Sequence, residues 1–258
     1  MPKVFMILAI DIGNSHSVLG LFDHKKVLKS SWRIRTIKDQ TADEFLLSVM
    51  GLMEKQKLNP SDLEGVVLGS VVPALTEELK KAFSNQNLLV IDCDKKFDFQ
   101  IKVQNPQTVG ADRLINAQAA LAEYKPPLLI IDAGTATTFC YLNESFEYRG
   151  GSILPGLHIS AQALYKKTSK LMAVDFEFPK SLLGDTTESA LKSGIMFGYV
   201  CMIDGLINKY KEEVNKNITV IGTGGLISLL IPQIKNKIHY DSNLTLKGLI
   251  SLWTKNSF

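Results

Sequence analysis

Two short segments place an acidic residue, a glycine and small residues, most of them polar, directly after an apolar run. The first is DIGNS at residues 11–15, and the second is DAGTA at residues 132–136. Backbone N–H groups in such a turn can bind phosphate oxygens, and a carboxylate beside them can hold the Mg²⁺ that bridges phosphates. For either segment alone, the alternative is an ordinary hairpin turn.

The two segments share one form. In each, an apolar run enters the acid and a second apolar run leaves the turn, so each is predicted to join two strands. Two matching strand–turn–strand units indicate a duplicated fold, and the common Asp-x-Gly frame disfavours a chance similarity of two hairpins. On facing lobes, two such turns could hold a triphosphate. Thr135, Thr137 and Thr138 would add hydroxyl groups, although the last two also suit a strand.

Asp132 stands at the end of an apolar strand, where an unpaired carboxylate would be costly. The residues after it offer hydroxyl and carbonyl oxygens rather than a lysine or an arginine, and oxygen-rich surroundings suit a hard cation. Asp132 could instead accept backbone N–H groups, or bind Mg²⁺ as its counterpart Asp11 could.

Two further segments could contact a substrate. GADR at residues 110–113 begins an alanine-rich run, which is predicted to be a helix over residues 111–124. Asp112 suits the first turn of a helix, whereas a positive charge such as that of Arg113 is disfavoured there, so the pair could act as a base and an anion clamp. GTGG at residues 222–225 lacks the third glycine of the dinucleotide fingerprint and fits either a nucleoside contact or a tight packing turn.

The composition limits the class of protein. The chain has 258 residues, a net charge of +3 and 45% hydrophobic residues, which is typical of a globular protein with a full core. The charge is too small to predict nucleic acid as a partner. Three cysteines without a CxxC pair predict neither a disulfide framework nor a zinc site. Because the apolar run at residues 4–10 is too short to span a membrane, we expect a cytoplasmic protein with no membrane partner.

Strands and helices alternate around these segments. In the first half, strands are predicted at residues 4–10, 17–22, 27–36, 63–72 and 87–93, and helices from about Thr41 and from Pro73. The second half repeats the plan and ends in a short helix. We expect lobes at residues 1–117 and 118–258, with the alanine-rich helix bridging them. A nearly all-apolar helical run at residues 193–207 must be buried in a core or against another subunit.

Taken together, the motifs resemble those of the type III pantothenate kinases, a branch of the acetate kinase/sugar kinase/Hsc70/actin superfamily, and the resemblance covers nearly the whole chain. It implies an α/β fold of two duplicated actin-like (ribonuclease H-like) lobes, with mixed sheets flanked by helices and the active site in the cleft between the lobes. The motifs that carry it, in order, are Asp11-x-Gly-Asn-Ser, Gly110-Ala-Asp-Arg113, Asp132-x-Gly-Thr135, Gly150-Gly-x-Ile-x-Pro-Gly156, Gly184…Thr187…Ser193-Gly194 and Gly222-x-Gly-Gly225.

The resemblance also implies a role for individual residues. Asp112 matches the catalytic base, Asp132 matches the ligand of a monovalent cation, and Asp11 is the expected Mg²⁺ contact. The residues that match the ATP site are Asp11, Ile12, Gly13, Asn14, Ser15, His16, Ser17, Val18 and Thr135. The residues that match the pantothenate site are Gly110, Ala111, Asp112, Arg113 and Thr187.

The activity implied by the resemblance is the ATP-dependent conversion of pantothenate to 4′-phosphopantothenate, the first step towards coenzyme A. The family acts as a homodimer and needs Mg²⁺ together with K⁺ or NH₄⁺. One departure is Val103, which stands where the family usually has a tyrosine that helps to hold pantothenate. The alternatives are another small-molecule kinase or phosphohydrolase of the superfamily, and a non-catalytic regulatory protein that kept the fold. The presence of Asp112 disfavours the regulatory protein.

Overall fold

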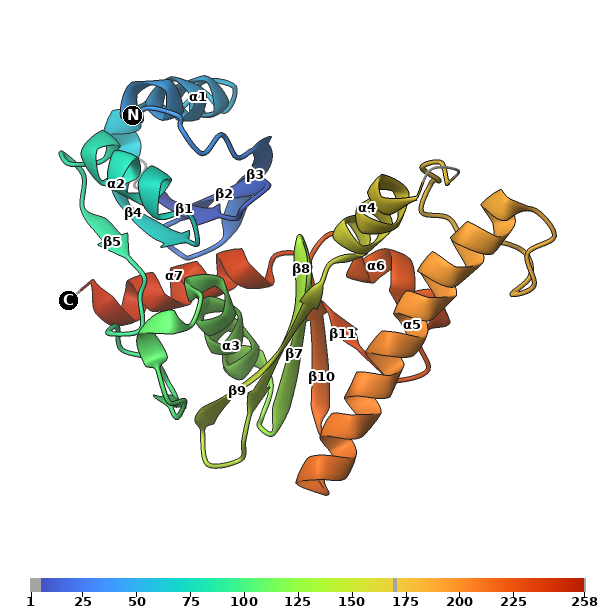
Figure 1. Ribbon diagram of the computed structural model, residues 1–258. Coiled ribbons are helices and arrows are strands. Elements are labelled where there is room, and N and C mark those ends of the chain that lie inside the picture. Colours follow the sequence, from blue (N-terminus) through green and yellow to red (C-terminus); the bar gives the residue numbers. More distant parts are fainter. Residues whose placement is uncertain (1–5, 169–170, 258) are drawn as a thin grey trace. The chain divides into compact units, whose positions relative to one another are not determined.

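The computed structural model describes residues 6–168 and 171–257, and the chain forms two compact units (Figure 1). Unit 1 comprises the chain up to Glu123 together with the segment from Asn243 onward. Unit 2 comprises Tyr124–Ser242. Each unit contains a mixed sheet covered by helices.

The sheet of unit 1 has the strand order β3-β2-β1-β4-β5. Strand β2 is antiparallel to both of its neighbours, whereas β1, β4 and β5 run parallel. The strands are β1 (Met6–Ile12), β2 (His16–Asp23), β3 (Leu28–Arg35), β4 (Leu63–Ser70) and β5 (Leu88–Val90). The other elements of this unit are α1 (Ala42–Glu54), α2 (Pro73–Ala82), β6 (Gln100–Ile101), α3 (Ala111–Glu123) and α7 (Leu244–Asn256), with 3₁₀ turns at Pro60–Asp62 and Pro106–Thr108.

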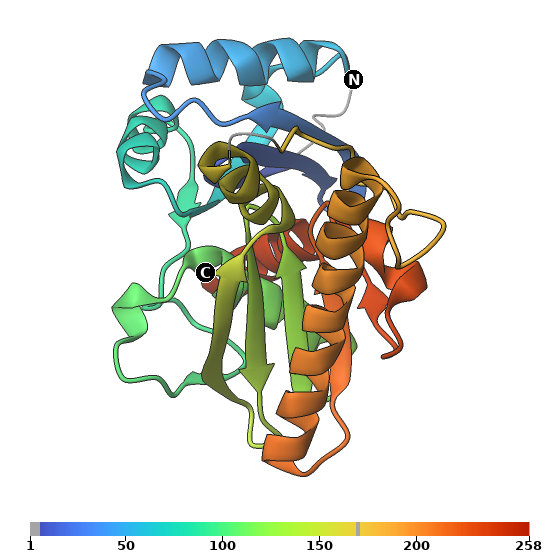
Figure 2. The same cartoon turned by 45° about the vertical axis from the view of Figure 1, so that its right-hand side comes forward.

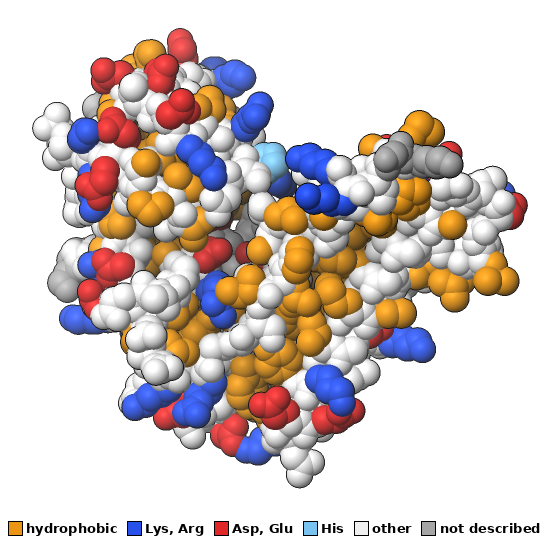
Figure 3. Space-filling model, viewed as in Figure 1, with side chains coloured by type: hydrophobic (Ala, Val, Ile, Leu, Met, Phe, Trp, Pro, Cys, Tyr) orange, Lys and Arg blue, Asp and Glu red, His pale blue; other side chains and the backbone are white. Residues whose placement is uncertain are grey.

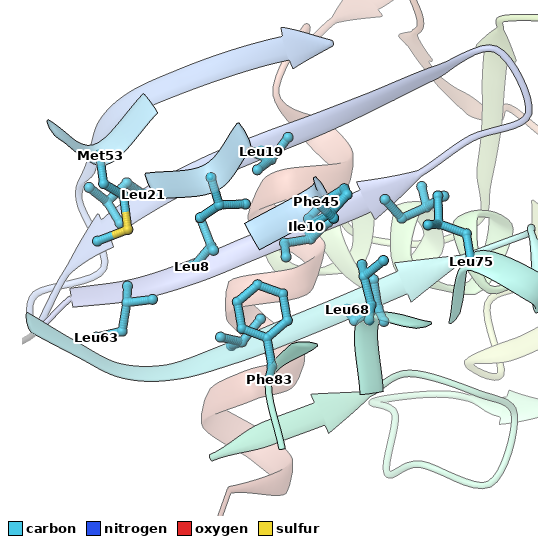
Figure 4. Close-up of a cluster of buried hydrophobic side chains, with 14 of the residues drawn as sticks. Leu8, Ile10, Leu19, Leu21, Phe45, Met53, Leu63, Leu68, Leu75 and Phe83 are labelled. Atoms are coloured by element: carbon cyan, nitrogen blue, oxygen red, sulfur yellow. The ribbon is translucent and has the colours of Figure 1, made fainter. Parts of the chain in front are cut away.

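Alternation along β1 gives unit 1 two hydrophobic layers. Leu8 and Ile10 face α1 and α2, where they join the cluster shown in Figure 4. Ile7 and Ala9 point to the opposite face and pack with residues of α3 and α7, among them Ile115. A strand that is buried on both faces needs an almost continuous apolar sequence, which explains the run before Asp11.

The sheet of unit 2 repeats the strand plan of unit 1. Strands β7, β8 and β9 are joined by antiparallel pairing, and β10 lies parallel to β7 on its other side, followed by β11. The strands are β7 (Leu128–Ala133), β8 (Ala136–Leu142), β9 (Glu147–Pro155), β10 (Thr219–Thr223) and β11 (His239–Tyr240). The helices are α4 (Leu157–Lys167), α5 (Thr187–Val214) and α6 (Ile227–Leu230), with a 3₁₀ turn at Ile231–Gln233. The predicted α/β class and the duplicated strand plan are therefore confirmed.

The division of the chain differs from the expected lobes at residues 1–117 and 118–258. The closing helix α7 packs against α3, where Gly248 has no side chain and lets the backbone of Ile115 approach. Leu246 and Leu249 of α7 complete the core of unit 1. The tail therefore belongs to unit 1, and α3 lies within that unit rather than bridging the two.

The apolar run at residues 193–207 lies in α5, which runs along one face of the sheet of unit 2 (Figure 2). Its Met196, Ile203 and Ile207 are fully buried against β7 and β10, but much of the remaining surface of the helix is accessible. By length and composition α5 could cross a membrane, with 33% of its most apolar window buried inside the protein. Core helices pass the same test, so this is weak evidence for a membrane span.

Candidate active site

The first turn lies at the carboxyl end of β1. Asp11, the next-to-last residue of that strand, is partly accessible, and its neighbours across the sheet are Val18 of β2 and Gly69 of β4. The N–H of Gly13 donates to the carbonyl of His16 over 3.1 Å and closes the turn. The side chain of Asp11 therefore emerges where the α3–α7 layer of the core ends.

The GADR segment approaches this turn within unit 1. The N–H of Val71 donates to the carbonyl of Ile12 over 3.0 Å. A side chain at Gly110 would begin 3.6 Å from the Val71 side chain. Ile115, about one helical turn after Asp112, packs over Gly69, which is the neighbour of Asp11 on β4. The structure thus brings the predicted ATP turn and the predicted base to the same end of one sheet.

The environment of Asp112 favours a proton acceptor. Burial raises the pKa of the Asp112 carboxyl above its ordinary value. The N–H of Arg113 donates to Asp112 Oδ1 over 2.8 Å, and this bond and the charge of Arg113 counteract part of the rise in pKa. A carboxylate with a raised pKa accepts a proton more readily than an ordinary aspartate, as a general base requires.

The second turn is built in the same way in unit 2. The N–H of Gly134 donates to the carbonyl of Ala136 over 3.0 Å, and the N–H of Gly156 donates to the carbonyl of Thr135 over 3.1 Å. Thr137 is buried, and its hydroxyl lies 2.5 Å from that of Tyr199. Tyr199 also donates to the carbonyl of Pro155 over 3.2 Å. Tyr199 of α5 therefore bonds to one residue of β8 and one of β9 next to the second turn.

The GTGG segment packs on Asp132. Thr223 pairs with Asp132 across the parallel strands β10 and β7. Gly224 has a φ of +89°, and a side chain there would begin 2.6 Å from both Asp132 Oδ1 and the carbonyl oxygen of Ala133. The segment therefore packs closely, as one of the two alternatives from the sequence predicts, and the nucleoside contact stays a prediction. Asp132 Oδ1 and the carbonyl oxygen of Ala133 both lie against the α-carbon of Gly224, where a larger residue would not fit.

The chain that carries these two turns matches a known protein family. The family described as "Type III pantothenate kinase" matches residues 7–209. The chain belongs to the type III pantothenate kinase family. A curated type III pantothenate kinase from Exiguobacterium sibiricum is 42% identical over 254 residues, which cover 97% of this chain and 100% of that protein. One from Bacillus cytotoxicus is 40% identical over 255 residues, covering 98% and 97% of the two chains.

Solved structures share the fold of this member of the type III pantothenate kinase family. A protein from Campylobacter jejuni described as a "conserved putative Baf family transcriptional activator" has a TM-score of 0.60 and 20% identity, over 96% of this chain and 97% of that chain. An activator of 2-hydroxyisocaproyl-CoA dehydratase from Clostridium difficile, with bound ADPNP, has a TM-score of 0.56 and 12% identity, over 96% and 92%. At these identities the likeness concerns the fold alone.

Thr187, the remaining predicted pantothenate contact of this type III pantothenate kinase family member, lies far in the sequence from Val103, the departure from the family pattern. Thr187 begins α5 in unit 2 and is exposed, next to Thr186, which caps the helix by accepting from the N–H of Ser189 over 3.1 Å. Val103 is partly buried in the loop after β6 of unit 1. Of the described residues, no group of three or more His, Cys, Asp or Glu side chains could hold a metal ion by itself.

Two residues beside the first turn were not among the predicted site residues. Arg33 Nη2 lies 3.0 Å from Nδ1 of His16, which places a guanidinium at the edge of the predicted ATP site. Thr36 directly follows β3, and its N–H donates to the carbonyl of Ser15 over 3.0 Å. The signal for Arg33 was the alternation in β3, where Arg33 and Arg35 share one face of the sheet. No sequence signal distinguishes Thr36 from an ordinary strand threonine.

Proposed function

We infer that this protein phosphorylates pantothenate with ATP, forming 4′-phosphopantothenate, the first step of coenzyme A biosynthesis. The observation that carries this inference is the family match over residues 7–209, together with relatives about 40% identical along nearly the whole chain. The geometry of unit 1 fits it, because an aspartate with a raised pKa lies beside a phosphate-binding type of turn.

The mechanism that we propose is transfer of the γ-phosphoryl group to the primary alcohol of pantothenate, a reaction that depends mainly on positioning and charge neutralisation. Asp112 accepts the alcohol proton as the oxygen attacks the γ-phosphorus, and the bond to the bridging oxygen breaks so that ADP leaves. Arg113 has a fork of donors that suits the substrate carboxylate or the transferred phosphoryl group. When bound, Mg²⁺ neutralises charge on the phosphates, and the partly accessible carboxylate of Asp11 is the group in unit 1 that would hold it.

The substrate contacts in the proposal follow the sequence motifs. The ATP phosphates would meet the first turn, including Gly13, Asn14 and Ser15, and the nucleotide would also contact Thr135. Pantothenate would contact Gly110, Ala111, Asp112, Arg113 and Thr187. Thr135 and Thr187 are both exposed, which supports their part in the proposal.

A monovalent cation site at Asp132 belongs to the proposal. Asp132 is partly accessible near the end of β7, and its Oδ1 and the carbonyl oxygen of Ala133 both lie close to Gly224. Oxygens of this kind suit a hard cation such as K⁺, and NH₄⁺ can donate to the same oxygens. We propose that K⁺ or NH₄⁺ bound there orders the second turn.

We also propose that the protein is a cytoplasmic homodimer. A groove of about 360 Å³ lies between α4 and α5, and it is lined mainly by apolar residues such as Leu164 and Ile195. Side chains added at Gly194 and Gly198 of α5 would meet no atom within 4 Å, and Ile153 on β9 is 64% exposed. Hydrophobic side chains gather over this part of unit 2 in Figure 3. A large accessible apolar face is typical of a protein interface.

The test of the proposed activity is ADP release by the purified protein with Mg-ATP, measured with pantothenate and with a panel of other alcohols. We expect ADP release that depends on pantothenate and that yields 4′-phosphopantothenate. Equal release without pantothenate, or release only with another alcohol, would overturn the assignment. The molecular mass in solution at micromolar protein concentration tests the dimer, and a monomeric mass would contradict it.

A further inference from the structure

Thr36 makes two bonds to the backbone of the first turn. Its N–H donates to the carbonyl of Ser15 over 3.0 Å. Its hydroxyl donates to the carbonyl of Gly13 over 2.8 Å. One residue, which follows β3, therefore holds two of the carbonyls of a turn that joins β1 to β2.

Ser17 completes the arrangement. The hydroxyls of Ser17 and Thr36 lie 2.8 Å apart, and both residues are almost completely buried, with 1% and 8% of their surface exposed. The single proton of the Thr36 hydroxyl is used on Gly13, so in this pair Ser17 donates and Thr36 accepts. A buried hydroxyl chain of this kind has one arrangement that satisfies its members, which fixes the side chain of Thr36.

The two bonds to carbonyls also set the direction of N–H groups. In a planar trans peptide the C=O and the N–H point in opposite directions. Because the carbonyl of Gly13 points at Thr36, the N–H of Asn14 points away from it, and the same holds for the N–H of His16 relative to the carbonyl of Ser15. These are N–H groups of the turn that would bind phosphate oxygens. Donors that are aimed in advance bind charge without a further cost of reorganisation.

We propose that Thr36 is a positioning residue for the nucleotide phosphates, and that it acts through the peptides of Gly13 and Ser15. The proposal deepens the proposed function, on which it rests for the identity of the nucleotide as the ligand. A purely structural role would make Thr36 matter for folding but leave the affinity of the folded protein for nucleotide unchanged. The two roles therefore differ in a measurable quantity.

The test is titration of Mg-ADP into the full-length Thr36→Val variant, which keeps the shape of the side chain and removes the hydroxyl. We expect its Kd for Mg-ADP to rise about tenfold, because the carbonyl of Gly13 loses its partner and the turn is no longer held. KM for ATP should rise by a similar factor, whereas KM for pantothenate should stay within about twofold. Thr36→Ser should restore both values.

Thr254→Val is the matched control. Thr254 also donates its hydroxyl to a backbone carbonyl in unit 1, that of Ile250 over 3.1 Å. It adjoins Trp253, which packs on Gly65 near the opposite end of β4 from the site. We expect wild-type nucleotide affinity in this control. A wild-type Kd in folded Thr36→Val, or an equal rise in Kd in Thr254→Val, would overturn the proposal.

The test stays decisive in two further cases, in which Thr36→Val does not fold or the proposed activity is not found. If Thr36→Val does not fold, Thr36→Ala removes the hydroxyl without placing a second methyl group beside Ser17, and we expect a similar rise in Kd of about tenfold. An unchanged Kd in that variant would contradict the proposal. If wild-type protein binds Mg-ADP but does not phosphorylate pantothenate, the proposed function fails while the titration still decides the role of Thr36.

Discussion

The two turns share a strand plan but are held by different chemistry. In each, the residue directly after the third strand donates its N–H to the turn, as Thr36 does to Ser15 and Gly156 does to Thr135. The first turn adds a side-chain hydroxyl, that of Thr36. At the second turn a side chain at Gly156 would collide with the carbonyl of Thr135. A duplicated fold can therefore keep its geometry while the residues that hold it change.

The contrast predicts opposite sensitivities to mutation. The first turn depends on a hydroxyl in a position that has room for a side chain, so the removal of polar atoms should harm it. The second turn depends on close backbone approach at Gly156 and Gly224, so the addition of carbon atoms should harm it. Unit 1 also contains Asp112, whereas the proposed part of Asp132 in unit 2 is to bind a cation.

The largest effect is expected from Asp112→Asn, which tests whether unit 1 supplies the proton acceptor. A general base contributes roughly 10²–10⁴-fold, so kcat should fall at least about a hundredfold, while the protein still folds and binds Mg-ADP. Steady-state kinetics and nucleotide titration measure the two quantities. Activity near that of the wild type would show that Asp112 is not the proton acceptor. Unit 1 would then no longer differ from unit 2 by supplying the base.

Gly224→Ala tests the close packing of the second turn. The residue has a φ of +89°, and the new carbon would lie 2.6 Å from Asp132 Oδ1 and from the carbonyl of Ala133. We expect a loss of about 1–3 kcal/mol in the free energy of unfolding, measured with denaturant, and a higher KM for ATP. Gly51→Ala is the control, because its side chain would meet no atom within 4 Å in α1. That variant should gain roughly 0.5–1 kcal/mol.

The response to monovalent cations tests whether Asp132 binds K⁺ or NH₄⁺ rather than Mg²⁺, the ion expected at Asp11. Replacing Na⁺ by K⁺ or NH₄⁺, at fixed Mg²⁺ and ionic strength, should raise the activity of the wild type several-fold, because a cation at Asp132 orders the second turn. Asp132→Ala should show no such response. Equal activity in Na⁺ and K⁺ would mean that Asp132 serves Mg²⁺ or the fold alone.

A smaller effect is expected from Val103→Tyr, which tests the pantothenate side of unit 1. The resemblance implies a tyrosine here, whose hydroxyl the valine lacks, and the residue is partly exposed in its loop. We expect KM for pantothenate to fall a few-fold and kcat to stay nearly constant, because the new contact acts on the ground and transition states alike. A large change in kcat with KM unmoved would contradict this expectation.

The sequence predicts most of the strand plan because local patterns determine it. The apolar run before Asp11 ends at a turn, and Thr41 caps α1 through a bond with the N–H of Glu44. The place of α7 could not be predicted, because its contacts with α3 join residues more than one hundred positions apart. The same reason applies to Gly224, whose tight contact with Asp132 depends on the pairing of β10 with β7.

The smallest expected effect is on the free energy of unfolding rather than on the reaction rate, and it follows from the raised pKa of Asp112. Burial makes the folded protein hold the Asp112 proton more tightly than the unfolded chain does. The folded state then binds more protons than the unfolded state just above the ordinary pKa of an aspartate, so this group lowers stability as the pH rises through that range. Asn carries no charge and lacks this cost.

Asp112→Asn should therefore gain stability relative to the wild type as the pH increases from acid to neutral, although its activity is lost. Urea unfolding of both proteins across this pH range measures the difference. Asp43→Asn is the control, since Asp43 lies in the first turn of α1, as Asp112 does in that of α3, but is exposed. A difference between Asp112→Asn and the wild type that falls with pH would show that the bond from Arg113, rather than burial, determines the pKa of Asp112. The ionised Asp112 would then stabilise the folded state of unit 1 instead of lowering its stability.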